Sequence, residues 1–142
     1  MKNIVIILAV FGWLLTACEV APQEINYGKD GCHFCKMTIV DNQHAAELVT
    51  AKGKAYKFDS IECLIHDLRQ REDEVALLLV CDYSRPGELI DARQATYLIS
   101  QNIPSPMGAY LSAFDSRQAA EAVQAEQGGD LYTWQEVQQT IK

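Results

Sequence analysis

Short apolar or alternating segments bounded by polar turn residues are the first pattern along the chain. Such segments are typical of strands, because successive side chains of a strand point to opposite faces. In the first half of the chain they span residues 37–40, 45–50, 55–58 and 75–80. The segment 75–80 is continuously apolar, which predicts a strand that is buried on both faces.

Between the third and fourth of these segments, the apolar positions change to helical spacing. These positions are Ile61, Leu64, Ile65 and Leu68. They place one apolar stripe along a helix. Asp59 precedes the stripe as an N-cap residue, and Glu62 follows three residues later, as a capping box requires. We therefore predict a helix that begins directly after Asp59.

The second half of the chain repeats this order. The expected elements are strands at 95–99 and 109–114, a helix at 116–127, and a closing helix at 132–141 with Trp134, Val137 and Ile141 inward. The tripeptide Phe-Asp-Ser at residues 58–60 recurs at residues 114–116, again between a strand and a helix. This repeat predicts two similar strand-strand-helix halves. Coincidence is the alternative, because such junctions favour Asp and Ser in any protein.

The N-terminal segment has the pattern of a bacterial export signal. Lys2 supplies a positive charge, residues 4–15 are almost wholly apolar, and residues 15–18 read Leu-Thr-Ala-Cys, which looks like a lipobox. An apolar run of this length is short for a membrane span. We predict a signal peptide at residues 1–17 and acylation of Cys18 as the first mature residue. An uncleaved anchor with an incidental cysteine is the alternative.

The residues after Cys18 bear on location and domain boundaries. Glu19, in place of an aspartate, favours the outer membrane over the inner membrane, with the protein facing the periplasm. Residues 18–31 are polar and contain proline and glycine, which predicts a tether. Residues 32–142 are then the metal-binding domain.

The charge of the chain excludes one class of partner. The formal net charge is −7. An acidic surface argues against nucleic acid as a partner and against the binding of anionic lipid by charge. Membrane attachment is therefore expected through acyl chains alone.

Cysteine and methionine supply the candidate chemistry. Cys32, Cys35 and Met37 place two thiols and a thioether within six residues. Soft sulfur ligands select Cu(I), zinc or iron–sulfur clusters, and thioether suits Cu(I) but not zinc. Met107 lies in a loop between proline and glycine, and packing of the two halves against each other would bring it near this motif. The alternative for Met107 is ordinary core packing.

Two other interpretations of Cys32 and Cys35 stay open. With Cys63 and His66 they form the spacing C-x2-C…C-x2-H, which suits a structural zinc site. The apolar neighbours of Cys63 on its helix also fit an inert core cysteine. A C-x-x-C pair can instead be redox-active or form a disulfide at rest. A strand after the pair disfavours the redox interpretation, because thiol pKa values fall most at a helix N-terminus.

Other polar residues suggest no further site. Cys81 ends an apolar strand and is expected to be an inert core cysteine, and His44 lies near a turn and is expected on the surface. The chain shows no nucleophile–base arrangement, phosphate-binding loop or paired catalytic carboxylates. We therefore expect no enzymatic turnover.

The order of these motifs resembles the NosL family. The resemblance rests on the lipobox and on four later segments. These are the Gly-Cys-His-Phe-Cys-Lys-Met run at 31–37, the Tyr-Lys-Phe-Asp-Ser run at 56–60, the Pro-Ser-Pro-Met-Gly loop at 104–108, and the Ala-Phe step at 113–114 before an alanine-rich helix. It covers essentially the whole mature chain. It implies an α+β fold in which two related strand-strand-helix-strand units pack as one small domain.

The resemblance also implies a function. NosL-like proteins bind Cu(I) and serve the maturation of nitrous oxide reductase, working with an ABC-type membrane complex. The resemblance therefore implies a periplasm-facing copper chaperone with a copper enzyme as its acceptor. Carried onto this chain, the first expected Cu(I) ligands are Cys35, Met37 and Met107, and Cys32 is the next.

Overall fold

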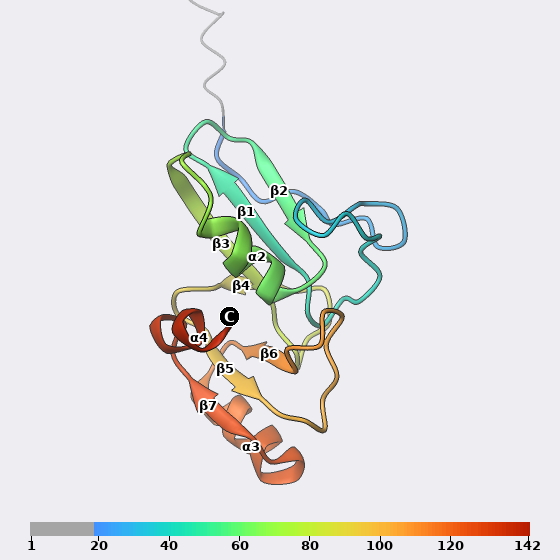
Figure 1. Ribbon diagram of the computed structural model, residues 1–142, viewed down its shortest axis with the longest axis vertical. Helices are drawn as coiled ribbons and strands as arrows, with labels where there is room; N and C mark the ends of the chain where they lie inside the picture. The colour runs from blue at the N-terminus through green and yellow to red at the C-terminus, as the bar shows by residue number, and fades with distance from the viewer. Residues whose placement is uncertain (1–18) are drawn as a thin grey trace, which may run out of the picture.

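Two antiparallel sheets and three helices make up residues 19–142, the part of the chain that the structure describes (Figure 1). The structure is a computed structural model. In chain order the elements are β1 (Ala46–Thr50), β2 (Ala55–Phe58), α2 (Ile61–Leu68), β3 (Val75–Cys81), β4 (Leu89–Asp91), β5 (Thr96–Ile99), β6 (Leu111–Phe114), α3 (Arg117–Gln127), β7 (Asp130–Tyr132) and α4 (Trp134–Thr140). None of these helices has the length and apolar character needed to cross a membrane. The expected signal peptide at 1–17 and the expected acylation site Cys18 lie outside the described residues.

Both sheets are built on the same plan. The first has the strand order β2-β1-β3-β4 and the second has the order β6-β5-β7, with antiparallel neighbours throughout. The first strand of each unit, β1 or β5, lies between two others. One neighbour is its hairpin partner, β2 or β6, and the other is the strand that follows the helix, β3 or β7. The expectation of an α+β domain of two similar strand-strand-helix-strand units is therefore confirmed.

The repeated Phe-Asp-Ser tripeptide begins both of the longer helices. The Ser60 backbone is extended, and its hydroxyl accepts a hydrogen bond from the Cys63 N–H at 3.2 Å. Ser116 caps α3 in the same way. The prediction that Asp59 caps α2 and that Glu62 completes its capping box is therefore wrong. The serine hydroxyl satisfies the free N–H of the first turn, while Asp59 lies one residue earlier and is buried.

The observed strands differ from the predicted ones in presence and in burial. Residues 37–40 form no strand, and only Thr38 makes an isolated bridge, to Gly31. The short strands β4 and β7 were not predicted. The strand at 75–80 is present as β3, but it is completely buried only toward Cys81. Its first residues extend beyond the stretch that pairs with β4 and stay partly exposed.

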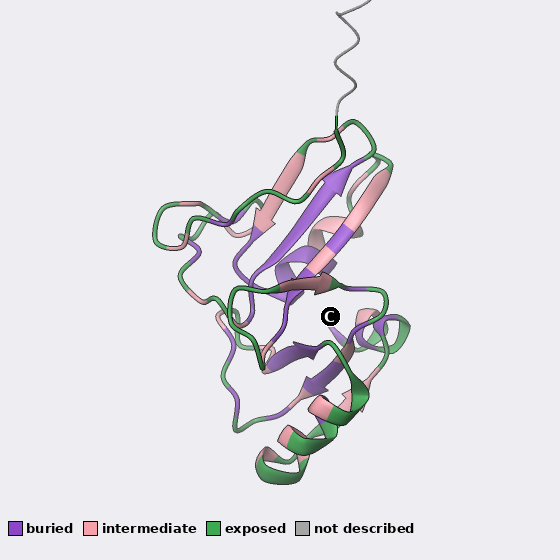
Figure 2. Ribbon diagram, turned by 180° about the vertical axis from the view of Figure 1, so that it is seen from behind, coloured by how far each residue is buried: buried purple, intermediate pink, exposed green. Residues whose placement is uncertain are grey.

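The hydrophobic core runs through both units. Figure 2 shows β1 buried along its whole length, whereas much of the α3 surface faces solvent. The closing helix α4 is confirmed with the expected orientation, since Trp134, Val137 and Ile141 are all buried. The Trp134 ring lies 5.7 Å from the ring of Tyr97 on β5. Each such buried side chain stabilises the fold by about 1.5–3 kcal/mol, so α4 holds the second sheet in place.

The segment that was expected to be a tether contacts the domain well before Cys32. Ile25 is buried and belongs to the hydrophobic core. The Gln23 N–H donates a hydrogen bond to Glu47 Oε1 at 2.7 Å. The contacts of the folded domain therefore begin near residue 23, and only a few residues separate them from Cys18.

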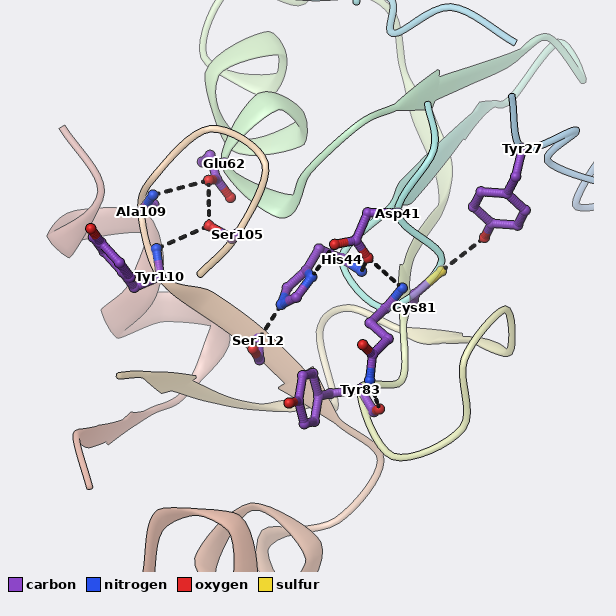
Figure 3. Close-up of polar contacts among 11 residues, drawn as sticks. Tyr27, Asp41, His44, Glu62, Cys81, Tyr83, Ser105, Ala109, Tyr110 and Ser112 are labelled. Carbon is purple, nitrogen blue, oxygen red and sulfur yellow. Dashed lines mark hydrogen bonds and ion pairs between the residues drawn. The ribbon is translucent and has the colours of Figure 1, made fainter. Parts of the chain in front are cut away.

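A buried histidine joins the two units. His44 Nδ1 lies 2.9 Å from Asp41 Oδ2, and His44 Nε2 lies 3.0 Å from Ser112 Oγ on β6 (Figure 3). The expectation of a surface histidine is wrong, because contact with the second unit leaves His44 only 2% exposed. The order Asp–His–Ser is that of a hydrolase triad, but Ser112 is completely buried and a substrate cannot reach it. The contact is therefore structural.

We expect Ser112→Ala to lower the free energy of unfolding by about 1–3 kcal/mol, because it leaves a buried ring nitrogen of His44 without its partner. Chemical denaturation followed by circular dichroism measures this change. Ser84→Ala, at an exposed serine, is the control and should change stability by less than about 0.5 kcal/mol. Equal unfolding free energies for the two variants would show that the contact between the units adds no stability.

Candidate metal centre

A tight loop holds the first two cysteines. It is closed by the antiparallel bridge between Gly31 and Thr38 and by a hydrogen bond from the Cys32 N–H to the Met37 carbonyl at 2.8 Å. Inside the loop, the Cys35 N–H points at Cys32 Sγ, with the two atoms 3.5 Å apart. The backbone bonds at its base therefore hold the loop in a shape that brings the two thiols together.

Helix α2 supplies a third thiol. Cys63 is the third residue of α2. The Sγ atoms of Cys32, Cys35 and Cys63 all lie within 4.8 Å of one another. Three sulfur atoms bound about 2.3 Å from one ion lie about 4 Å apart, so small side-chain movements let a single soft ion contact all three thiols. Cys32 and Cys63 are buried and Cys35 is half-buried, so the cluster opens to solvent on the Cys35 side. All four cysteines of the described chain are free thiols.

The three thiols differ in acidity. The Cys63 S–H and the backbone N–H groups of Asp59 and Cys35 donate to the Cys32 sulfur, and together they lower the pKa of Cys32 to about 4 against the opposing effect of burial. The pKa of Cys63 is raised because its proton is held by the Cys32 sulfur, and burial raises the pKa of Cys35. Cys32 is therefore more acidic than an ordinary cysteine, and it offers a thiolate to a soft cation more readily than the other two thiols do.

The two predicted methionine ligands lie on exposed loops. Met37 is 52% exposed and Met107 is 43% exposed. Met107 lines a cavity of about 440 Å³ together with Cys63, His66 and Phe34. An exposed position in a cavity wall is unlike core packing, which was the alternative for Met107. A methionine of the second unit thus shares a cavity with one thiol of the first.

Cys63 combines two of the roles considered for it. It is buried, as a core cysteine would be, and it joins the C-x-x-C pair, as a zinc ligand would. Among the described residues, Cys32, Cys35 and Cys63 form the group of histidine, cysteine or acidic side chains that is close enough to share an ion, and His66 is outside it. The His66 ring instead stacks on Phe34, with ring centroids 5.4 Å apart.

Comparison with known proteins places the chain in a family. The NosL family model matches residues 22–141. The chain belongs to the NosL family. The copper-binding lipoprotein NosL of Stutzerimonas stutzeri is 30% identical to it over 151 aligned positions, which cover 95% of this chain and 78% of the relative. The crystal structure of the copper chaperone NosL from Shewanella denitrificans is similar with a TM-score of 0.72 and 27% identity, over 83% of this chain and 96% of that one.

The membership confirms the resemblance inferred from the motifs. The match to the NosL family includes the loop with Cys32, helix α2 with Cys63 and the loop with Met107. Neither of the two NosL relatives is named as an enzyme, which agrees with the expectation of no enzymatic turnover.

Replacing Cys63 by Ala should raise the pKa of Cys32 above its value of about 4, because the variant loses the S–H group that stabilises the thiolate. The ultraviolet absorbance of thiolate in the reduced, metal-free protein measures this pKa. One thiolate should form near pH 4 in the parent and at higher pH in Cys63→Ala. Cys81→Ala removes a buried thiol outside the cluster and should leave the pH at which the first thiolate forms unchanged. If the first thiolate formed at the same pH in Cys63→Ala as in the parent, this would contradict the hydrogen bond from the Cys63 S–H to the Cys32 sulfur.

Proposed function

We propose that this chain is a membrane-anchored Cu(I) chaperone that delivers copper to a periplasmic copper enzyme, with nitrous oxide reductase as the acceptor. The observation that carries copper binding is the group of three thiols whose sulfur atoms lie within 4.8 Å of one another. The names of the two relatives, a copper-binding lipoprotein and a copper chaperone, support the metal and the role. Delivery to the reductase and work with an ABC-type membrane complex are supported by the family resemblance.

The donor set suits Cu(I) better than zinc. Cu(I) accepts both thiolate and thioether ligands, and it can be bound at a low coordination number. Structural zinc takes four ligands from cysteine, histidine and carboxylate side chains. The cluster supplies three thiols, and Met37 and Met107 are the soft donors on the adjoining loops. A zinc site would need His66 as its fourth ligand, and His66 is outside the group. The proposed Cu(I) site therefore comprises the cysteine cluster and the two methionines.

Burial divides these donors into two kinds. Cys32 and Cys63 are buried and keep water away from the ion, whereas Cys35 is half-buried and both methionines are exposed. A ligand from the acceptor can displace an exposed donor while the buried thiols still hold the ion. A thioether leaves without taking up a proton, so this exchange depends little on pH. The arrangement combines tight holding with transfer through shared ligands.

Acylation at Cys18 is the proposed means of attachment. The name of the Stutzerimonas stutzeri relative as a lipoprotein supports it, and Glu19 favours the outer membrane with the domain facing the periplasm. Because domain contacts begin near Gln23, few residues lie between the anchor and the fold. The folded domain would therefore stay close to the membrane surface.

Anaerobic titration of the reduced protein tests the metal. We expect one Cu(I) per chain, bound more tightly than Zn(II), with only sulfur neighbours in X-ray absorption. Cys32→Ser should weaken Cu(I) binding by about a hundredfold, measured by competition with a chromophoric Cu(I) chelator, because it removes the thiolate. Cys81→Ser is the matched control, since that thiol is buried beside Tyr27 and outside the cluster. Tighter zinc binding with a nitrogen neighbour would favour a structural-zinc module instead.

Delivery is tested in cells that make nitrous oxide reductase. Cells that carry Cys32→Ser in place of the parent chain should assemble a reductase with less copper, because the chaperone no longer holds its cargo. Cells with Cys81→Ser should match the parent. Metal analysis of the purified reductase measures the difference. A full copper content with Cys32→Ser would contradict delivery and leave the binding proposal in place.

A further inference from the structure

One carboxylate connects the cysteine helix to the methionine loop. Glu62 precedes Cys63 in α2, yet its side chain contacts residues 43 and 47 positions further along the chain. Its Oε1 accepts a hydrogen bond from the Ser105 hydroxyl at 3.0 Å and another from the Ala109 N–H at 3.2 Å (Figure 3). Because Ser60 caps the helix, Glu62 is not needed for capping and points to the second unit.

These two bonds hold both ends of the turn that carries Met107. The turn is closed by a hydrogen bond from the Gly108 N–H to the Ser105 carbonyl at 3.0 Å, and Gly108 has a φ of 79°, which glycine adopts without strain. The Ser105 hydroxyl donates to Glu62 and accepts from the Tyr110 N–H at 2.9 Å. One carboxylate oxygen therefore sets where the Met107 turn lies relative to α2.

Burial makes this contact strong. Glu62 is 3% exposed, and a hydrogen bond in the low-dielectric interior is stronger than one exposed to water. Its other oxygen, Oε2, is buried with no hydrogen-bond partner, and such burial costs free energy. The bonds to the methionine loop are what offset that cost. Glu62 also lines the same cavity as Cys63 and Met107.

We propose that Glu62 is a positioning residue that holds the Met107 sulfur at the cavity that Met107 shares with Cys63 of the cysteine cluster. The contribution of Met107 to Cu(I) binding then depends on Glu62. This inference rests on the proposed function, because it requires Cu(I) at the cysteine cluster with Met107 as a ligand. The cysteines do not depend on Glu62, since Cys32 and Cys35 are held by their own loop and α2 is capped by Ser60.

A double-mutant cycle on the full chain tests the inference. Cu(I) affinity is measured by competition with a chromophoric chelator for the parent, Met107→Ala, Glu62→Ala and the double variant. Met107→Ala should weaken binding about tenfold in the parent and less than about twofold where Glu62 is already replaced. The Cu(I)-loaded Glu62→Ala variant should also show one sulfur neighbour fewer than the parent in X-ray absorption.

Two further variants separate positioning from folding. Glu62→Gln keeps an oxygen acceptor at the same place, so the Met107→Ala effect should persist in that background. Ser105→Ala removes one of the two bonds while Glu62 stays, and should reduce the Met107→Ala effect even if Glu62→Ala fails to fold. Thermal unfolding of each variant shows which of them are folded.

Three results would contradict either the positioning role of Glu62 or the proposed function. An equal effect of Met107→Ala in the parent and in the folded Glu62→Ala or Ser105→Ala background overturns the role of Glu62. No effect of Met107→Ala in the parent also overturns it, while the cysteines remain the copper site. Failure of the parent itself to bind Cu(I) overturns the proposed function.

Discussion

The metal centre depends on one constraint, the packing of the cysteine loop against the first turn of α2. The His33 N–H donates to the Lys57 carbonyl of β2 at 2.8 Å, and β2 leads directly into the helix. The same strand therefore anchors the loop and sets where the helix begins, which brings Cys32 and Cys63 to one place. The donors around the Cys32 sulfur then replace water and lower the pKa of this thiol despite its burial. The three thiols are therefore largely in place before an ion arrives.

The repeated architecture is used differently in its two copies. The offset that relates Ser60 to Ser116 also relates Cys63 to Ala119, so only the first unit has a thiol at this position of its helix. The second unit contributes the Met107 loop to the shared cavity. A domain built from two similar units thus lines one cavity with a buried thiol of the first unit, Cys63, and an exposed thioether of the second, Met107. Buried contacts between the units, such as the hydrogen bond between His44 and Ser112 on β6, fix the position of one unit relative to the other.

Local pattern was sufficient for most of the fold, and long-range contacts account for what it missed. The apolar stripe at 61–68 and the recurring Phe-Asp-Ser tripeptide predicted α2 and the two-unit plan, because helical spacing and capping are properties of neighbouring residues. The burial of His44 depends on a serine 68 residues away, which no local pattern reveals. The sequence spacing grouped Cys63 with Cys32 and Cys35 as possible zinc ligands, whereas its apolar helical neighbours favoured an inert core cysteine. The folded loop is what brings the three sulfur atoms together. The sequence motif indicated Met107 as a candidate Cu(I) ligand, and the structure shows that Met107 lines the same cavity as Cys63.

The most direct measurement of the central claim is anomalous X-ray diffraction from crystals of the Cu(I)-loaded protein. We expect one copper peak within bonding distance of the sulfur atoms of Cys32, Cys35 and Cys63. A copper peak at another place, with these three thiols unbound, would contradict it.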